Sequence, residues 1–210
     1  MLQQSYEEVY ARTVALFEKV GLDLNIFEKE SVKSFEQLVT EVWCGEAILT
    51  EIGKPGCLKR IAWSSKLIIC TYLEYLVEMF RIYPSRNARI IKKSLFVDIW
   101  LEAPNWTLSE TALKTEDPLV VILRGLREEL GIIPLQINEL RCLNPGETWI
   151  DTHASSVYHG VITENHTTWY EWKMEDRHPL LLPDSIMRED GDVELHLKWQ
   201  PYNFTLASNG

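Results

Sequence analysis

The sequence predicts an α+β domain with a mixed sheet, preceded by a helical extension at the N-terminus. Three observations predict this class. Helical periodicity fills residues 1–55, β-type runs dominate 58–100, and a well-capped helix at 118–130 is followed by further strands. We therefore expect a helical extension over residues 1–57 and the main domain over residues 58–210.

Two helices are expected in the N-terminal extension. Ser5 followed by Glu8 fits a capping box, and apolar residues recur at helical spacing up to Gly21, which predicts a helix over 6–20. A second apolar stripe begins at Val32 and continues to the helix breaker at 53–56 (GKPG). Residues 1–55 are thus expected to form a helical pair, which we expect to bind a partner or a second copy of the chain.

A long β-hairpin is expected next. Residues 58–83 are rich in Ile, Tyr, Val and Leu, the tripeptide 85–87 (SRN) offers a turn, and a second β-type run covers 90–100. Residues 66–80 also fit a period of 3.6, so a buried helix is the alternative for that stretch.

The helix at 118–130 has clear ends, because Asp117 is a good N-cap, Pro118 suits the first helical position and Gly131 is a typical stop. Its expected core face is Leu119, Ile122, Leu123, Leu126 and Leu130. Further strands are expected at 157–162, 168–173 and 193–200, with a loop over 179–192.

The charge distribution excludes some function classes. The net charge is −10, and the excess of acidic residues lies entirely after residue 100, where 18 Asp and Glu stand against 8 Lys and Arg. Such a surface repels phosphates unless a cation intervenes, so nucleic acid is not expected as a partner. With no long apolar stretch and no signal-like N-terminus, a cytoplasmic protein without a membrane partner is expected. The four cysteines form no CxxC pair, which predicts reduced thiols.

Two carboxylates meet at the end of the 118–130 helix. At helical spacing Gly125, Glu128 and Glu129 share one face. Both glutamates fall in the last turn, where the helix dipole disfavours each anion by about 0.3–1 kcal/mol. A divalent cation could offset this, since Mg²⁺ prefers a few carboxylates. The neighbouring Arg124 and Arg127 could offset it instead, as surface ion pairs.

Residues 124–132 (RGLREELGI) resemble the second half of the Nudix box, whose pattern is Gly, five residues, Glu, seven residues, then Arg-Glu-apolar-X-Glu-Glu-X-Gly-apolar. Glu116 matches the first box glutamate in register. The chain departs from the pattern at two positions: Glu110 replaces the box glycine, and Gly125 replaces a carboxylate that binds metal or helps to activate water in active members.

The resemblance implies a mixed sheet between helices and a loop-helix-loop that binds Mg²⁺ or Mn²⁺. It implies that Glu128 and Glu129 are catalytic metal ligands, and that Glu116, Arg124 and Gly131 maintain the box structure. The expected function is metal-dependent hydrolysis of a diphosphate linkage in a small molecule, such as a nucleoside diphosphate derivative. The alternative is a catalytically inactive Nudix-fold module for binding or scaffolding.

Hydrolysis also needs a base to activate water. The candidates are Glu110, Glu147, Glu171 and Glu175. Glu171 is preferred, because the aromatic residues around it could raise its pKa by desolvation, although a surface glutamate between packed aromatic side chains is the alternative. Trp106 and Trp149 are candidates for the lining of a substrate pocket, and Arg127 for a substrate contact.

Overall fold

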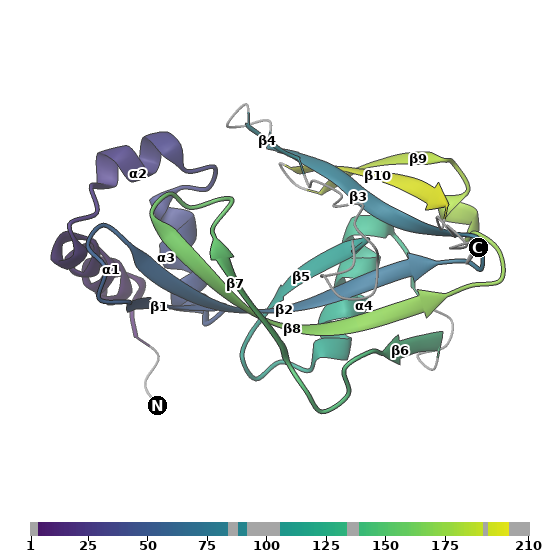
Figure 1. Cartoon of the computed structure of the whole chain (residues 1–210), viewed down its shortest axis with the longest axis horizontal. Helices are drawn as coiled ribbons and strands as arrows, with labels where there is room; N and C mark the ends of the chain where they lie inside the picture. The colour runs from purple at the N-terminus through teal and green to yellow at the C-terminus, as the bar shows by residue number, and fades with distance from the viewer. Residues whose placement is uncertain (1–3, 84–87, 92–105, 134–138, 191–192, 202–210) are drawn as a thin grey trace, which may run out of the picture. The chain divides into compact units, whose positions relative to one another are not determined.

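The computed structural model describes residues 4–83, 88–91, 106–133, 139–190 and 193–201. The described residues form four α-helices: α1 (Tyr6–Val20), α2 (Leu24–Glu30), α3 (Phe35–Cys44) and α4 (Pro118–Leu130) (Figure 1). They also form ten strands: β1 (Ala47–Glu51), β2 (Leu58–Cys70), β3 (Glu74–Tyr83), β4 (Ala88–Ile91), β5 (Leu108–Ala112), β6 (Leu140–Cys142), β7 (Trp149–Ala154), β8 (Val161–Lys173), β9 (Ser185–Asp190) and β10 (Val193–Pro201). The predicted α+β class with N-terminal helices is confirmed.

The chain divides into two compact units. The first unit comprises residues 1–65, 110–121 and 144–168, and the second comprises 66–109, 122–143 and 169–210. β2, β5, β8 and α4 therefore each contribute residues to both units. The expected boundary at residue 57 stays a prediction. Within the described ranges, no helix is long and apolar enough to cross a membrane.

The first predicted helix is confirmed with its cap. Ser5 Oγ accepts a hydrogen bond from the backbone N–H of Glu8, and the Glu8 carboxylate accepts one from the backbone N–H of Ser5, which forms the capping box. α1 ends at Gly21, whose φ of +74° favours glycine.

The second predicted helix is wrong in its extent. The predicted stretch contains a single short helix, α3, and the chain then enters β1 before the breaker at 53–56, while α2 lies ahead of the stretch. A capping box of Ser34 and Gln37 begins α3, and Gly45 ends it in the left-handed conformation. The residues after Gly45 pair antiparallel with β2, so strand pairing overrides the apolar pattern that had been taken as helical.

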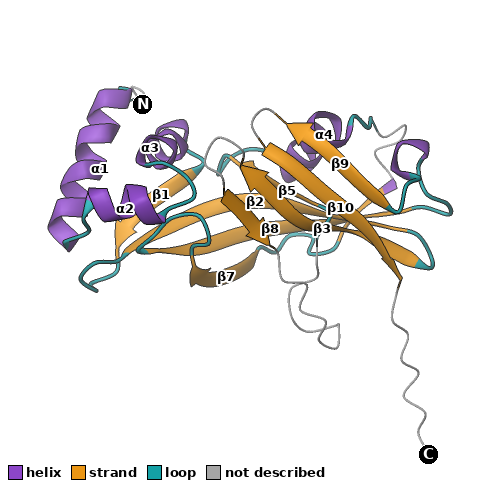
Figure 2. Ribbon diagram, turned by 90° about the horizontal axis from the view of Figure 1, so that it is seen from above, coloured by secondary structure: helices purple, strands orange, loops and turns teal. Residues whose placement is uncertain are grey.

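Aromatic side chains form the core of the first unit. Phe17, Phe27 and Phe35 come from α1, α2 and α3 and are almost completely buried. The Phe17 ring lies 5.1 Å from the Phe27 ring and 5.1 Å from the Phe35 ring, in edge-to-face geometry. The Tyr158 ring stacks on Phe27. Figure 2 shows the three helices gathered beside β1.

The predicted hairpin is confirmed in part, because β3 and β4 pair antiparallel on either side of residues 84–87, from Phe80 opposite Ile91 to Tyr83 opposite Ala88. Residues 58–83 form two antiparallel strands, β2 and β3, and the buried-helix alternative for 66–80 is wrong. Thr71 makes the turn, because its Oγ1 accepts hydrogen bonds from the N–H groups of Leu73 and Glu74. The turn expected at 85–87 and residues 92–100 of the second β-type run lie outside the described residues.

Antiparallel pairing continues through the second unit. Hydrogen bonds connect β3 with β4 and β10, β10 with β9, and β6 with the end of β8. The predicted strand at 193–200 is confirmed, and its alternate residues Leu195, Leu197 and Trp199 are buried. The loop expected over 179–192 is wrong in part, because 185–190 pair with β10 as β9.

The two strands predicted at 157–162 and 168–173 are one strand, β8. It begins only at Val161, since Gly160 has a φ of +69° that belongs to a turn. β7, which the sequence pattern did not reveal, pairs antiparallel with the first half of β8.

Candidate functional site

The ends of α4 are built as the sequence predicts. At the start, the Asp117 side chain accepts a hydrogen bond of 2.9 Å from the N–H of Leu119. At the end, Gly131 has a φ of +67°, and its N–H donates to the carbonyl of Arg127. The N–H of Ile132 donates to the carbonyl of Leu126. These contacts fix both ends of the helix that carries the candidate carboxylates.

Glu116 closes the loop between β5 and α4. Its Oε2 accepts a hydrogen bond of 3.2 Å from the N–H of Leu113, and its own N–H donates to the Leu113 carbonyl at 3.0 Å. Both hydrogen bonds connect Glu116 to Leu113 across this loop, and the structural role that the resemblance implies for Glu116 stays a prediction.

The buried side of α4 differs from the predicted core face. Ile122, Leu126 and Leu130 are buried as expected, whereas Leu119 and Leu123 are only half-buried. Another row of buried residues consists of Val121, Gly125 and Glu129, at intervals of four residues. Gly125 and Glu129 therefore lie together on the buried side of the helix.

The two candidate metal ligands have different environments. Glu129 is 6% exposed. The Glu128 side chain is 49% exposed, and its carboxylate lies 3.4 Å from the exposed guanidinium of Arg127. An exposed pair of this kind contributes less than about 1 kcal/mol. The structure therefore pairs Glu128 with an arginine in solvent and keeps Glu129 inside.

The donor set does not fit a preformed metal centre. Over the described part of the chain, no group of three or more His, Cys, Asp and Glu side chains could hold a metal ion. Mg²⁺ can bind through two carboxylates with water and phosphate, but both must then reach it. Glu128 is exposed and paired with Arg127, Glu129 is buried, and Gly125 adds no third carboxylate.

Glu171, the preferred candidate for the base, is part of an ion pair. It stands opposite Arg141 of β6 in the strand register, and Nη2 of Arg141 donates to its Oε2 at 2.8 Å. The carboxylate therefore has a cationic partner where desolvation between aromatic side chains was expected. Of the other candidates, Glu147 and Glu175 are exposed and Glu110 is half-buried.

Trp106 contacts a lysine that the sequence analysis did not single out. Lys66 is 7% exposed, and its Nζ lies 3.9 Å from the centroid of the Trp106 ring and 5.1 Å from that of Trp169. A desolvated cation–π contact of this kind contributes about 2 kcal/mol. The sequence feature that could have identified this contact is a lysine inside the apolar run of β2. Trp149, the other pocket candidate, begins β7 and is 48% exposed.

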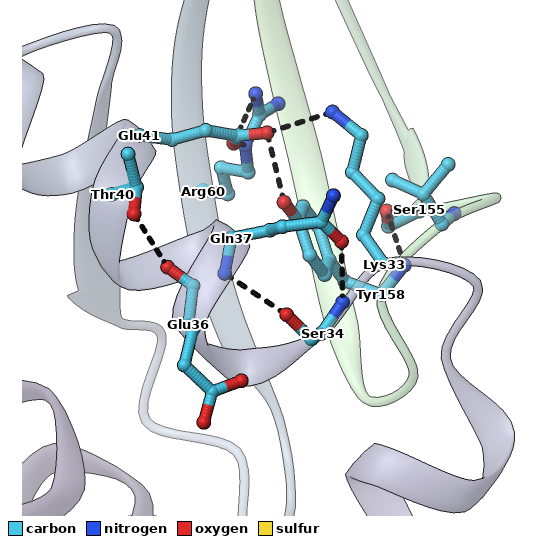
Figure 3. Close-up of polar contacts among 10 residues, drawn as sticks. Lys33, Ser34, Glu36, Gln37, Thr40, Glu41, Arg60, Ser155 and Tyr158 are labelled. Atoms are coloured by element: carbon cyan, nitrogen blue, oxygen red, sulfur yellow. Dashed lines mark hydrogen bonds and ion pairs between the residues drawn. The ribbon is translucent and has the colours of Figure 1, made fainter. Parts of the chain in front are cut away.

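A second buried charge, also missed, lies in the first unit. The Glu41 carboxylate of α3 accepts hydrogen bonds from Lys33 Nζ at 3.0 Å, from Arg60 Nε at 2.8 Å and from the Tyr158 hydroxyl at 2.8 Å (Figure 3). Burial opposes its charged form, but Lys33 and Arg60 outweigh this and lower the pKa of Glu41. We call these four residues the Glu41 cluster. The sequence feature that could have identified this cluster is a glutamate beside the apolar stripe of α3.

The Glu41 cluster is a structural connection. It joins α3 to β2 and to the turn before β8, and both carboxylate oxygens accept hydrogen bonds from protein groups. A carboxylate held in this way has little capacity left for a ligand. The cluster therefore explains how the N-terminal helices are attached to the strands of the first unit.

No protein-family model matches the chain, and no curated protein matches it. Among solved structures, the chain is similar to an Ap4A hydrolase from C. elegans, with 14% identity over 67% of this chain and 80% of the other, at a TM-score of 0.33. A Nudix-family hydrolase from Clostridium perfringens has 11% identity over 66% and 80%, at 0.32. A MutT/nudix family protein from Enterococcus faecalis has 14% identity over 78% and 58%, at 0.28.

Two of these structures carry the name of the family that the box resembles. At such TM-scores the backbones agree over only part of their paths, so a function for this chain has to rest on its own residues.

Proposed function

We propose that this chain is a catalytically inactive, Nudix-like binding module. One observation carries the proposal: at the end of α4 Glu128 pairs with Arg127 in solvent, Glu129 is buried, and Gly125 stands where the box has a further carboxylate. The residues that would have to act together on a diphosphate are thus divided between two environments.

The chemistry of hydrolysis explains why this division matters. Water attack at phosphorus requires cations that stabilise the developing charge and a positioned base that takes the proton from water. Gly125 supplies neither a ligand nor a base. Glu171, the preferred candidate for the base, forms an ion pair with Arg141 at 2.8 Å.

The box-like segment retains the residues that support its structure more fully than the residues that would take part in hydrolysis. Asp117 and Gly131 cap α4, and Glu116 closes the loop in front of it. These contacts serve to hold a loop-helix-loop in shape, and a fixed shape is what a binding surface needs. A small-molecule diphosphate remains a candidate ligand, with a partner protein or a second copy as the others.

A metal-dependent diphosphate hydrolase is the second candidate, and the burial of Glu129 favours it. Glu129 is 6% exposed and lies in the last turn of the helix, where the helix dipole disfavours an anion and a cation would be stabilising. If Mg²⁺ or Mn²⁺ binds, Glu129 and Glu128 are the residues that would hold it. The cation would then stabilise negative charge on the phosphate oxygens.

Calorimetric titration with Mg²⁺ and with Mn²⁺ tests the proposal. The wild type is compared with Glu129→Gln, and Glu18→Gln on the exposed side of α1 serves as the matched control. The binding-module account predicts no site tighter than about millimolar in any of the three proteins, the range of weak ion binding. Tighter binding that Glu129→Gln removes and Glu18→Gln retains would favour the hydrolase.

A further inference from the structure

β7 is an edge strand of the first unit. It pairs antiparallel with β8 from Trp149 opposite Thr167 to Ala154 opposite Ile162, and no other described strand pairs with it. Five of its six residues are exposed and Asp151 is half-buried. One row of backbone N–H and C=O groups is therefore available for a further strand.

β7 has few of the features that protect an edge strand. Soluble proteins block such edges with charged side chains, above all lysine, and with proline, a bulge or a very short strand. The sequence of β7, WIDTHA, contains neither lysine nor proline, and its register with β8 is continuous over all six residues. It also exposes two large apolar side chains, Trp149 at 48% and Ile150 at 56%.

The charges of β7 are arranged for self-complementarity. Asp151 and His153 are two residues apart and so lie on one face of the strand, and the His153 Nδ1 lies 2.9 Å from the Asp151 Oδ2. If a second β7 pairs antiparallel about a two-fold axis at Thr152, each Asp151 lies opposite the partner's His153. Each Ile150 then lies opposite the partner's Ala154.

Neighbouring registers lack this match. An axis at Asp151 places the two Asp151 carboxylates opposite each other, which is destabilising. An axis midway between Asp151 and Thr152 places the Asp151 carboxylate opposite the uncharged Thr152 of the second copy. The Thr152-centred register is therefore the one in which two opposite-charge pairs and two apolar pairs form together.

We propose that β7 is a homodimerisation edge, which pairs antiparallel with β7 of a second copy about an axis at Thr152. The two-fold symmetry makes the contact isologous, so it closes at a dimer. This proposal does not depend on whether the chain binds or hydrolyses a diphosphate. It also differs from association through the helices of residues 1–55.

Sedimentation equilibrium over a wide range of protein concentration, at about pH 6 where histidine side chains carry substantial positive charge, tests the proposal. The wild type should show a monomer–dimer equilibrium. Asp151→Lys should weaken it by about tenfold or more, because two attractive pairs become repulsive. The double variant Asp151→His with His153→Asp should restore it, since the exchange keeps opposite charges facing each other.

Ile26→Lys, at an exposed position of α2, is the control and should leave the dimer unchanged. Circular dichroism shows whether each variant keeps its fold. A wild type that is monomeric at every concentration would overturn the proposal, as would a dimer that Asp151→Lys does not weaken. Dissociation by Ile26→Lys alone would also overturn it and would place the interface on the helices.

Discussion

Replacing Glu41 by glutamine tests the role of the Glu41 cluster. The substitution keeps the size of the side chain but removes its charge. Arg60 is buried almost as deeply as Glu41, at 9% against 7% exposed. Its Nε donates a hydrogen bond of 2.8 Å to Oε2 of the carboxylate, and its Nη2 lies 2.8 Å from the same oxygen. Glutamine has a single acceptor oxygen, so its N–H₂ group would face either Arg60 or the two donors on Oε1, Lys33 and the Tyr158 hydroxyl.

The expected loss of stability comes from the Arg60 guanidinium, which would remain buried without its carboxylate partner. Removing one partner of a buried ion pair costs about 3–5 kcal/mol, because the remaining charge is uncompensated in a poorly solvated place. Lys33 adds little to this cost, since its side chain is 29% exposed and can be solvated. We therefore expect Glu41→Gln to lower the free energy of unfolding by about 3–5 kcal/mol at pH 7.

Urea denaturation followed by tryptophan fluorescence and circular dichroism measures this loss. Glu36→Gln is the matched control, since Glu36 lies on the same helix and is exposed, and it should cost at most about 1 kcal/mol. A loss below about 1 kcal/mol for Glu41→Gln would refute the reasoning, because it would mean that Arg60 does not depend on Glu41.

The loss of stability in Glu41→Gln should depend on pH. The pKa of Glu41 is lower in the folded chain than in the unfolded chain, so the folded state favours the charged carboxylate. The contribution of Glu41 to stability is therefore complete above the unfolded pKa and is lost as the pH falls through the folded pKa. The difference in stability between the wild type and Glu41→Gln should be largest near neutral pH and shrink on acidification. A difference that stays constant would contradict the lowered pKa.

Three further predictions use the same denaturation assay. Tyr158→Phe should cost about 1.5–3 kcal/mol, because it removes a buried hydrogen bond to a charged carboxylate, and it should cost much less in the Glu41→Gln background. Leu126→Ala should cost about 2–5 kcal/mol through a cavity under α4, and a loss below about 1 kcal/mol would show that this face is not packed. Gly131→Ala should cost about 1 kcal/mol because of the φ of +67°, so an unchanged stability would contradict the helix stop.

Local sequence signals predicted the elements whose ends they mark. The capping box at Ser5 and the pair of Asp117 and Gly131 identified α1 and α4 to the residue, because caps act through contacts only a few residues apart. The strict alternation after residue 193 likewise identified β10, since one of its faces is buried and the other is not.

The errors in the predicted elements occur where pairing with a strand distant in the sequence determines the structure. The stretch after Gly45 continues an apolar stripe, but its residues pair with β2 and become β1. Residues 185–190 carry charges typical of a loop, yet they pair with β10. The residue pattern of one segment does not reveal which other segment will pair with it as a strand. Such pairing overrides the local preference for a helix or a loop.

The candidate site was predicted in part for the same reason. A helical wheel places Glu128 and Glu129 on one side, but it does not say where the border of the buried surface falls. The structure places that border between them. The ion pair of Glu171 with Arg141 and the cation–π contacts of Lys66 join residues far apart in the sequence, which no spacing rule could reveal.

The most direct test of the central claim is the release of hydrolysis products, either phosphate monoesters or inorganic phosphate, separated by anion-exchange chromatography after incubation with excess Mg²⁺ or Mn²⁺. Nucleotide sugars, dinucleoside polyphosphates and prenyl diphosphates serve as substrates for the wild type, for Glu129→Gln and for the Glu18→Gln control. An inactive binding module predicts no release above the rate without protein for any of them. Turnover by the wild type and by Glu18→Gln that is lost in Glu129→Gln would contradict it and identify a hydrolase.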